Sequence, residues 1–282
     1  MKKGWRRFWM ICGILFGTGV VLVLIAAVFG TSKTVIEESN VGQMIRNHIF
    51  SKGIYEVEDK NSDFDGSSTQ ADEVQKYQGI RQIDADISVG TLEIRKTTDA
   101  EVRVETAGVK SSWGFKQRQD GDTLDLSMKK KVSTKNNKSK IIVYLPEDME
   151  LQEVSLELGA GVLYIEDIVT GKLDIDMGAG QATVDHFKAG DLEVSCGAGE
   201  VTLTGTVEAG ADLECGTGQI TYHAAGAEED YNYDMKSGIG DITINSRSVS
   251  GLGKENFVNN EAYKTITASC GIGEISIDFE KK

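Results

Sequence analysis

The sequence predicts an all-β protein built as a parallel β-solenoid, a β-helix-like stack of coils. Three observations lead to this class. A Gly-x-Gly tripeptide recurs through the C-terminal half, apolar and polar residues alternate on both sides of it, and the first three steps between copies are all 19 residues. The next two steps are 22 and 33 residues. The bend glycines are Gly159 and Gly161, Gly178 and Gly180, Gly197 and Gly199, Gly216 and Gly218, Gly238 and Gly240, and Gly271 and Gly273.

The amino-acid composition, and above all the net charge, limits which kinds of partner the protein is expected to bind. The chain has 282 residues and a net charge of −14. Residues 1–30 hold four basic side chains and no acidic one, so residues 31–282 carry −18. A body this acidic repels phosphate backbones, which excludes nucleic acid as the expected partner. The 32 glycines accompany a single proline, unlike a collagenous or disordered chain.

The N-terminal residues predict attachment to a membrane. Residues 8–30 contain no charge and follow Lys2, Lys3, Arg6 and Arg7. Such a run spans a bilayer core of about 30 Å, and its basic flank is expected in the cytoplasm. Residues 1–30 are therefore predicted to be a cytoplasmic tail and a transmembrane signal anchor, in a single-pass cell-membrane protein with an extracytoplasmic C-terminal part. A cleaved signal peptide is the alternative, and cleavage is left open.

Two further regions follow. Residues 31–79 include an acidic stretch without a periodic apolar face, which is typical of a linker or stalk. Strand-like alternation begins at Ile80, so residues 80–282 are predicted to be the repeat domain, with regular coils from about residue 150.

Aligning the repeats on their glycines predicts which side chains face inward. Successive residues of a strand point to opposite faces, so the alternating apolar residues can share one interior. We expect like residues on neighbouring coils to stack in columns, and glycine to be required at the bends for positive φ or close backbone approach. The lengthened last two steps are interpreted as loops inserted on one face. The inward positions before the bends include Leu156, Ile175, Val194 and Leu213.

The outward positions predict two chemically different surfaces. After the bend, a hydroxyl ladder is expected from Thr183, Thr202, Thr221, Thr243 and Ser276. Before the bend, Asp234 and Glu157 are expected to extend a carboxylate column. The candidate interaction face consists of Asp174, Asp176, Glu193, Asp212 and Glu214. Carboxylates stacked this closely repel each other and need solvent, counterions or a cationic ligand.

This acidic face has three interpretations. A solvated surface is favoured, and weak binding of cations or of a cationic partner is second. Paired carboxylates could also serve glycoside hydrolysis, but that chemistry needs one acid held protonated, and a ladder of equivalent acids offers no such asymmetry. No catalytic residue, cofactor or metal site is assigned, and no phosphate-binding loop is recognised, since no Gly-Lys-Ser/Thr follows the bends.

Three cysteines occupy inward positions just before a bend: Cys196, Cys215 and Cys270. Small thiols pack well in an apolar interior, so buried free thiols are the favoured interpretation. A disulfide between Cys196 and Cys215 on adjacent coils stays open, and a metal site is the remaining alternative.

The run IIVYLP at Ile141–Pro146, followed by LQEVSLELGAGVLYIEDI and the repeated GAG, GTG and GIG bends, resembles the bacterial putative-adhesin β-strand-repeat family (DUF4097) over about residues 80–279. The resemblance implies a β-helix-like fold and a place in the cell envelope of a Gram-positive bacterium. It implies no catalytic residues.

The sequence therefore predicts a non-catalytic surface or envelope interaction module. Its partner is expected to be an envelope protein or polymer, with self-association through exposed β edges. The alternatives are a scaffold or sensor subunit in envelope-stress signalling, and a polysaccharide-active enzyme that uses the acidic face.

Overall fold

The computed structural model describes residues 73–128, 139–245, 247–250 and 253–279. They lie in the second of two compact units, residues 59–282. These residues form strands and two short 3-10 turns, η2 (Ser111–Trp113) and η3 (Glu228–Asp230). The strands are β1 (Glu73–Tyr77), β2 (Gln82–Thr97), β3 (Val102–Ala107), β4 (Phe115–Asp120), β5 (Thr123–Met128), β6 (Lys140–Pro146), β7 (Glu150–Cys196), β8 (Glu200–Cys215), β9 (Gln219–Ala224), β10 (Tyr231–Ser237), β11 (Asp241–Ile244), β12 (Arg247–Ser250), β13 (Lys254–Val258), β14 (Lys264–Cys270) and β15 (Glu274–Phe279).

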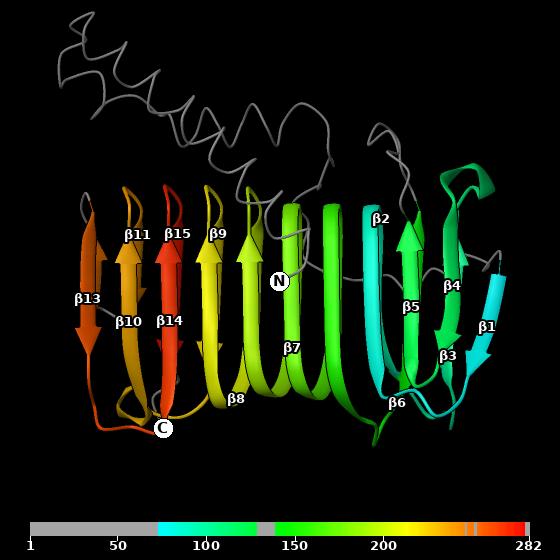
Figure 1. Ribbon diagram of the computed structural model, residues 1–282, viewed down its shortest axis with the longest axis horizontal. Helices are drawn as coiled ribbons and strands as arrows, with labels where there is room; N and C mark the ends of the chain where they lie inside the picture. The colour runs from blue at the N-terminus through cyan, green and yellow to red at the C-terminus, as the bar shows by residue number, and fades with distance from the viewer. Residues whose placement is uncertain (1–72, 129–138, 246, 251–252, 280–282) are drawn as a thin grey trace, which may run out of the picture. The chain divides into compact units, whose positions relative to one another are not determined.

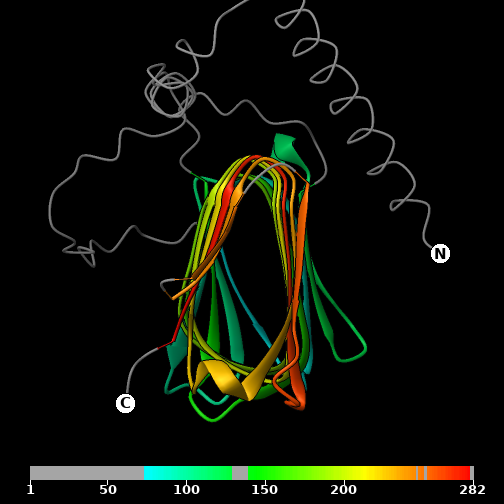
Figure 2. The same cartoon turned by 90° about the vertical axis from the view of Figure 1, so that its left-hand side faces the viewer.

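The strands form a β-solenoid-like stack of parallel rungs, as predicted (Figure 1). A rung is a pair of strand segments joined by a bend, and neighbouring rungs pair in parallel register. Seen along the stack, the rungs superimpose as a flattened closed outline with two long sheet faces (Figure 2). Strand β7, with 47 residues, runs around several corners without interruption, and the 16-residue β8 passes from one face to the other, so each contributes to both faces.

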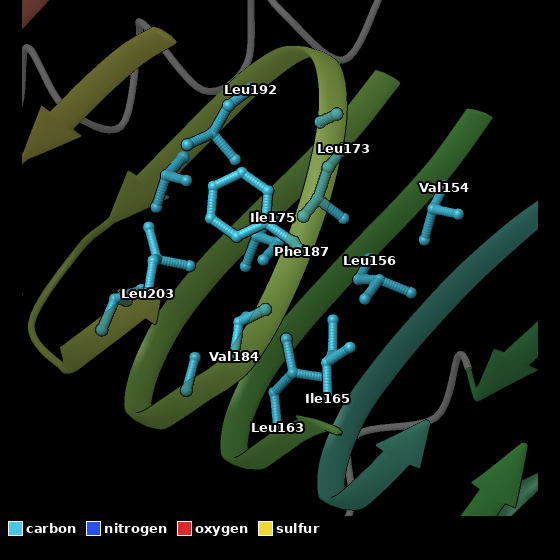
Figure 3. Close-up of a cluster of buried hydrophobic side chains, with 14 of the residues drawn as sticks. Val154, Leu156, Leu163, Ile165, Leu173, Ile175, Val184, Phe187, Leu192 and Leu203 are labelled. Carbon is cyan, nitrogen blue, oxygen red and sulfur yellow. The ribbon is translucent and has the colours of Figure 1, made fainter. Parts of the chain in front are cut away.

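The interior between the two faces is apolar. Leu156, Ile175, Val194 and Leu213, predicted to point inward, are all buried. Figure 3 shows this packing, with Leu156 and Ile175 on one face and Leu163 and Ile165 on the other. Each large side chain buried in this way contributes about 1.5–3 kcal/mol. The period-2 alternation of the sequence is therefore what closes the two sheets onto each other.

The bend glycines stack directly on one another, for the two reasons expected from the sequence. Gly161 and Gly180 have φ values of 146° and 122°, a backbone region that side chains rarely allow. At Gly197 the reason is close approach, because a Cβ atom there would lie 2.7 Å from the carbonyl oxygen of Gly178. Glycine at the bends lets successive rungs stay in register.

The spatial order of the C-terminal rungs differs from the sequence order. Strand β15 pairs in parallel with β9 on one side and with β11 on the other, and β14 likewise lies between β8 and β10. The chain therefore leaves β9, passes over one rung position, builds β10 and β11, and returns to fill the gap with β14 and β15. The interpretation of the long steps as loops on one face is wrong: they hold this crossover and the antiparallel strands β12 and β13.

The N-terminal end has the same kind of insertion. Strand β2 pairs in parallel with β5 and β6 on one side and with β7 on the other. The chain thus passes from β6 to β7 across a rung that β2 fills. Antiparallel strands β4, β3 and β1 complete this end. Both ends of the regular stack are closed by segments remote in sequence.

The predicted location in a membrane is corrected. Within residues 73–128, 139–245, 247–250 and 253–279, no helix combines the length and the apolar composition needed to cross a bilayer. The predicted transmembrane segment, residues 8–30, and the linker up to residue 72 lie outside the described residues.

Candidate functional site

The acidic face is the outward side of the sheet that contains β5, the first half of β2, and the segments of β7 and β8 that precede each bend. The predicted residues Glu193 and Asp212 lie opposite each other on neighbouring strands. The face extends beyond the five predicted residues, because Asp84 of β2 lies opposite Asp125 of β5, and Asp86 lies opposite Glu157 of β7. Its members are Asp84, Asp86, Asp125, Glu157, Asp174, Asp176, Glu193, Asp212 and Glu214.

Sequence reasoning missed the three aspartates of β2 and β5. A signal for two of them was present: residues 83–90 read IDADISVG, which matches LDIDMGAG at residues 173–180. What the sequence did not reveal is that β2 stacks directly on β7.

One predicted member falls outside the face. Asp234 was expected to continue the column beyond Asp212, but Thr267 of the inserted strand β14 lies between them. Asp234 forms an ion pair with Lys236 instead, at 3.3 Å. The insertion of β14 and β15 therefore ends the acidic face.

A basic side chain sits at the edge of the acidic face. Lys172 Nζ lies 2.7 Å from Glu193 Oε2 and 3.7 Å from Asp174 Oδ2. Beside it is an open hollow of about 380 Å³, lined by Lys172, Glu193 and Asp212 and by Gly210, which lies opposite Asp191. Lys172 offsets part of the repulsion, as Arg118 does where it pairs with Asp125 at 2.9 Å.

Partial burial raises the pKa of five of these carboxyl groups, and repulsion between acids adds to the effect in four of them. For Asp174, partial burial is the main cause of the raised pKa, followed by the charge of Glu193, against which Lys172 acts. Burial alone raises the pKa of Asp176. Burial, followed by neighbouring acids, also raises the pKa of Glu157, Asp212 and Glu214. These groups resist ionisation when the protein is folded.

We expect the protein to become more stable as pH falls from neutral toward about 4, the ordinary carboxyl pKa. A raised folded-state pKa means that the native state binds more protons than the unfolded state, so this stabilising contribution is complete below the ordinary pKa and is lost as pH rises through the raised one. Urea unfolding at a series of pH values measures it. Asp176→Asn should flatten the dependence, whereas Asp148→Asn, which removes an exposed charge elsewhere, should not. Equal slopes in both variants would contradict the assignment.

The opposite sheet face carries the predicted hydroxyl ladder. Thr202 lies between Thr183 and Thr221. The ladder continues through Ser276 of the inserted strand β15 before it reaches Thr243. The ladder residues were therefore predicted correctly, but their spatial order follows the inserted rung.

Cys196, Cys215 and Cys270 are buried free thiols, as the sequence favoured. In the described residues, no group of three or more His, Cys, Asp or Glu side chains could hold a metal ion.

The geometry defines a class of protein: a β-solenoid-like stack with two flat, chemically distinct faces. Sequence comparison assigns the chain to a family. The Toastrack DUF4097 family model matches residues 80–253. This is more than half of the chain, so the chain belongs to that family.

Comparison with solved structures finds matches among bacterial proteins. A "putative cell adhesion protein" from Clostridium sporogenes is 17% identical, with 74% of this chain and 98% of that chain covered and a TM-score of 0.40. A "putative adhesin" from Bacteroides fragilis is 17% identical, covering 73% and 96%, with a TM-score of 0.34. Another from Parabacteroides merdae is 12% identical, covering 74% and 95%, with a TM-score of 0.33. Likeness at this level carries no inference about what this chain binds. The comparison with curated protein sequences found no match.

Proposed function

We propose that this protein is a non-catalytic interaction module that binds a cell-surface protein or polymer bearing repeated positive charges. The observation that carries the proposal is the acidic face, in which carboxylates recur along a flat sheet at the strand spacing of about 4.8 Å. Burial is the main cause of the raised pKa of Asp174, Glu157 and Glu214, and repulsion between neighbouring acids adds to it. A partner with regularly spaced cationic groups would relieve that repulsion. Many weak contacts of this kind give specificity through charge complementarity.

The catalytic alternative receives less support from the same geometry. Glycoside hydrolysis needs two carboxyl groups in different protonation states, whereas Asp174 and Asp176, neighbours on one strand, have pKa values shifted in the same direction. A role as a signalling scaffold stays a prediction, as does self-association. The latter would use β1, β4, β12 and β13, the outermost strands among the described residues.

The test is binding of the full chain to a lysine homopolymer and to isolated bacterial cell walls. Neutralising five acids of the face (Asp174→Asn, Asp176→Asn, Glu193→Gln, Asp212→Asn, Glu214→Gln) should weaken binding at least about tenfold and reduce its salt dependence.

The matched control neutralises five exposed acids elsewhere, at Glu147, Asp148, Glu150, Glu229 and Glu261, and gives the same net charge. It should bind nearly as the natural protein does. Equal losses in both variants would show that net charge alone acts, and release of sugar fragments from the walls would favour the enzyme.

A further inference from the structure

The three buried cysteines form a column across adjacent rungs. Cys196 of β7 lies opposite Cys215 of β8, and Cys215 lies opposite Cys270 of β14, both in parallel register. Adjacent strands are about 4.8 Å apart, which falls inside the Cα separation of about 4.4–6.8 Å that disulfides span. The sequence drew attention to Cys196 and Cys215 because they are 19 residues apart. The inserted rung adds a second neighbour for Cys215.

Topology singles out the pair Cys215 and Cys270, because these two residues lie opposite each other on β8 and β14 and their thiols influence each other's pKa. Both sulfur atoms lie at the bends, beneath residues without side chains. A Cβ atom at Gly273 would lie 2.7 Å from Cys215 Sγ, and one at Gly240 would lie 2.6 Å from Cys270 Sγ. The bend glycines thus make room for the sulfur atoms of the preceding rung.

The position of the pair in the topology determines which rungs a bond between the two cysteines would join. Strands β14 and β15 are held between the β8–β9 rung and the β10–β11 rung, and neither of those rungs is adjacent to them in sequence. A bond between Cys196 and Cys215 would join consecutive coils. A bond between Cys215 and Cys270 would instead cross the junction at which the inserted rung was added.

We propose that Cys215 and Cys270 are a disulfide-forming site whose oxidation fastens the inserted β14–β15 rung to the β8–β9 rung. The oxidant is a small-molecule disulfide such as oxidised glutathione. The reaction needs a local opening at the bend, since Cys215 and Cys270 are only 4% and 3% exposed.

The exchange proceeds in two steps. The neighbouring Cys215 thiol lowers the pKa of Cys270, so Cys270 is the first to ionise. The Cys270 thiolate attacks the oxidant, forming a mixed disulfide and releasing one small thiolate. Cys215 then loses its proton and attacks the Cys270 sulfur, releasing the second. Two electrons pass from the protein to the oxidant, and the two protons end on the released thiols.

The experiment uses the full chain with Cys12→Ser, which leaves only the three column cysteines. Reduced protein and protein incubated with oxidised glutathione are digested without reductant and their linked peptides identified. We expect an intramolecular Cys215–Cys270 link. Amide exchange of β14 and β15 should then slow at least about tenfold in the oxidised protein, with β7 unchanged.

Serine variants provide the controls. Serine is compatible with this column, since Ser237 of β10 lies opposite Cys270. Cys196→Ser should keep both the link and the slowed exchange, and Cys270→Ser should lose both. A main product joining Cys196 to Cys215, links only between chains, or three unreacted thiols would each overturn the proposal. So would a Cys215–Cys270 link that leaves exchange of β14 and β15 unchanged. The peptide map of the unsubstituted column decides the question even if Cys270→Ser does not fold.

Discussion

Ending the chain after Tyr263 is expected to abolish the cooperative unfolding transition. The removed residues include the inserted rung, whose Ile266, Ile275, Ile277 and Phe279 are buried. At about 1.5–3 kcal/mol for each large apolar side chain, the loss is on the order of 10 kcal/mol, as large as the whole stability of a typical domain. The truncation also leaves an unfilled rung, so β8, β9, β10 and β11 each lose a pairing partner.

Circular dichroism during thermal unfolding, together with light scattering, measures this effect. We expect no sharp transition and a strong tendency to aggregate. The control ends the chain after Phe279, the last residue of β15, and should unfold like the natural protein. If rungs were stacked in sequence order, removing the final one would leave a shorter but intact stack. A cooperative transition in the chain ending at Tyr263 would therefore contradict the inserted arrangement.

Gly180→Ala is expected to destabilise the protein by about 2–6 kcal/mol. Two costs combine: the φ of 122° is unfavourable for alanine, and the new Cβ would overlap the carbonyl oxygen of Gly161 on the preceding rung. Each cost is about 1–3 kcal/mol. Because the overlapping atom belongs to the backbone, no side-chain movement relieves it, and the rungs would have to separate locally.

Gly121→Ala is the matched control for this prediction. Gly121 also has a positive φ, 64°, but no atom lies within 4 Å of a Cβ placed there. It should therefore show only the conformational cost of about 1–2 kcal/mol. Urea unfolding of both variants separates backbone strain from backbone collision. Similar losses in the two would mean that close approach between rungs is unimportant.

The local features of this fold could be predicted from the sequence. Alternation around each bend identified Leu156 and Ile175 as core residues, and a constant step identified the stack, because burial of one face and register between like coils are both written in short segments. The need for glycine at positions 161 and 180 was predictable for the same reason, because few backbone conformations allow a corner between two strands.

The order of the rungs was not predictable in this way. Every coil has nearly the same pattern, so β15 satisfies the edge of β9 about as well as β11 would, and local rules cannot choose between them. The choice depends on long-range pairing across 55 residues, as between Gln219 and Glu274. This is also why the acidic face was predicted too short at one end, without Asp84 and Asp86, and too long at the other, with Asp234.

The inserted rungs at the two ends have a consequence for how such a protein can change in length. A simple tandem array grows or shrinks anywhere, including at its tips. Here β2 and β14–β15 bind the ends of the stack to distant stretches of chain, so gain or loss of a repeat there would break pairings on both sides. Among the described strands, the interior of β7 offers a place where a 19-residue unit can be duplicated or deleted with both neighbours unchanged. A change in the number of rungs, whether by evolution or by design, is therefore expected in the middle of the stack.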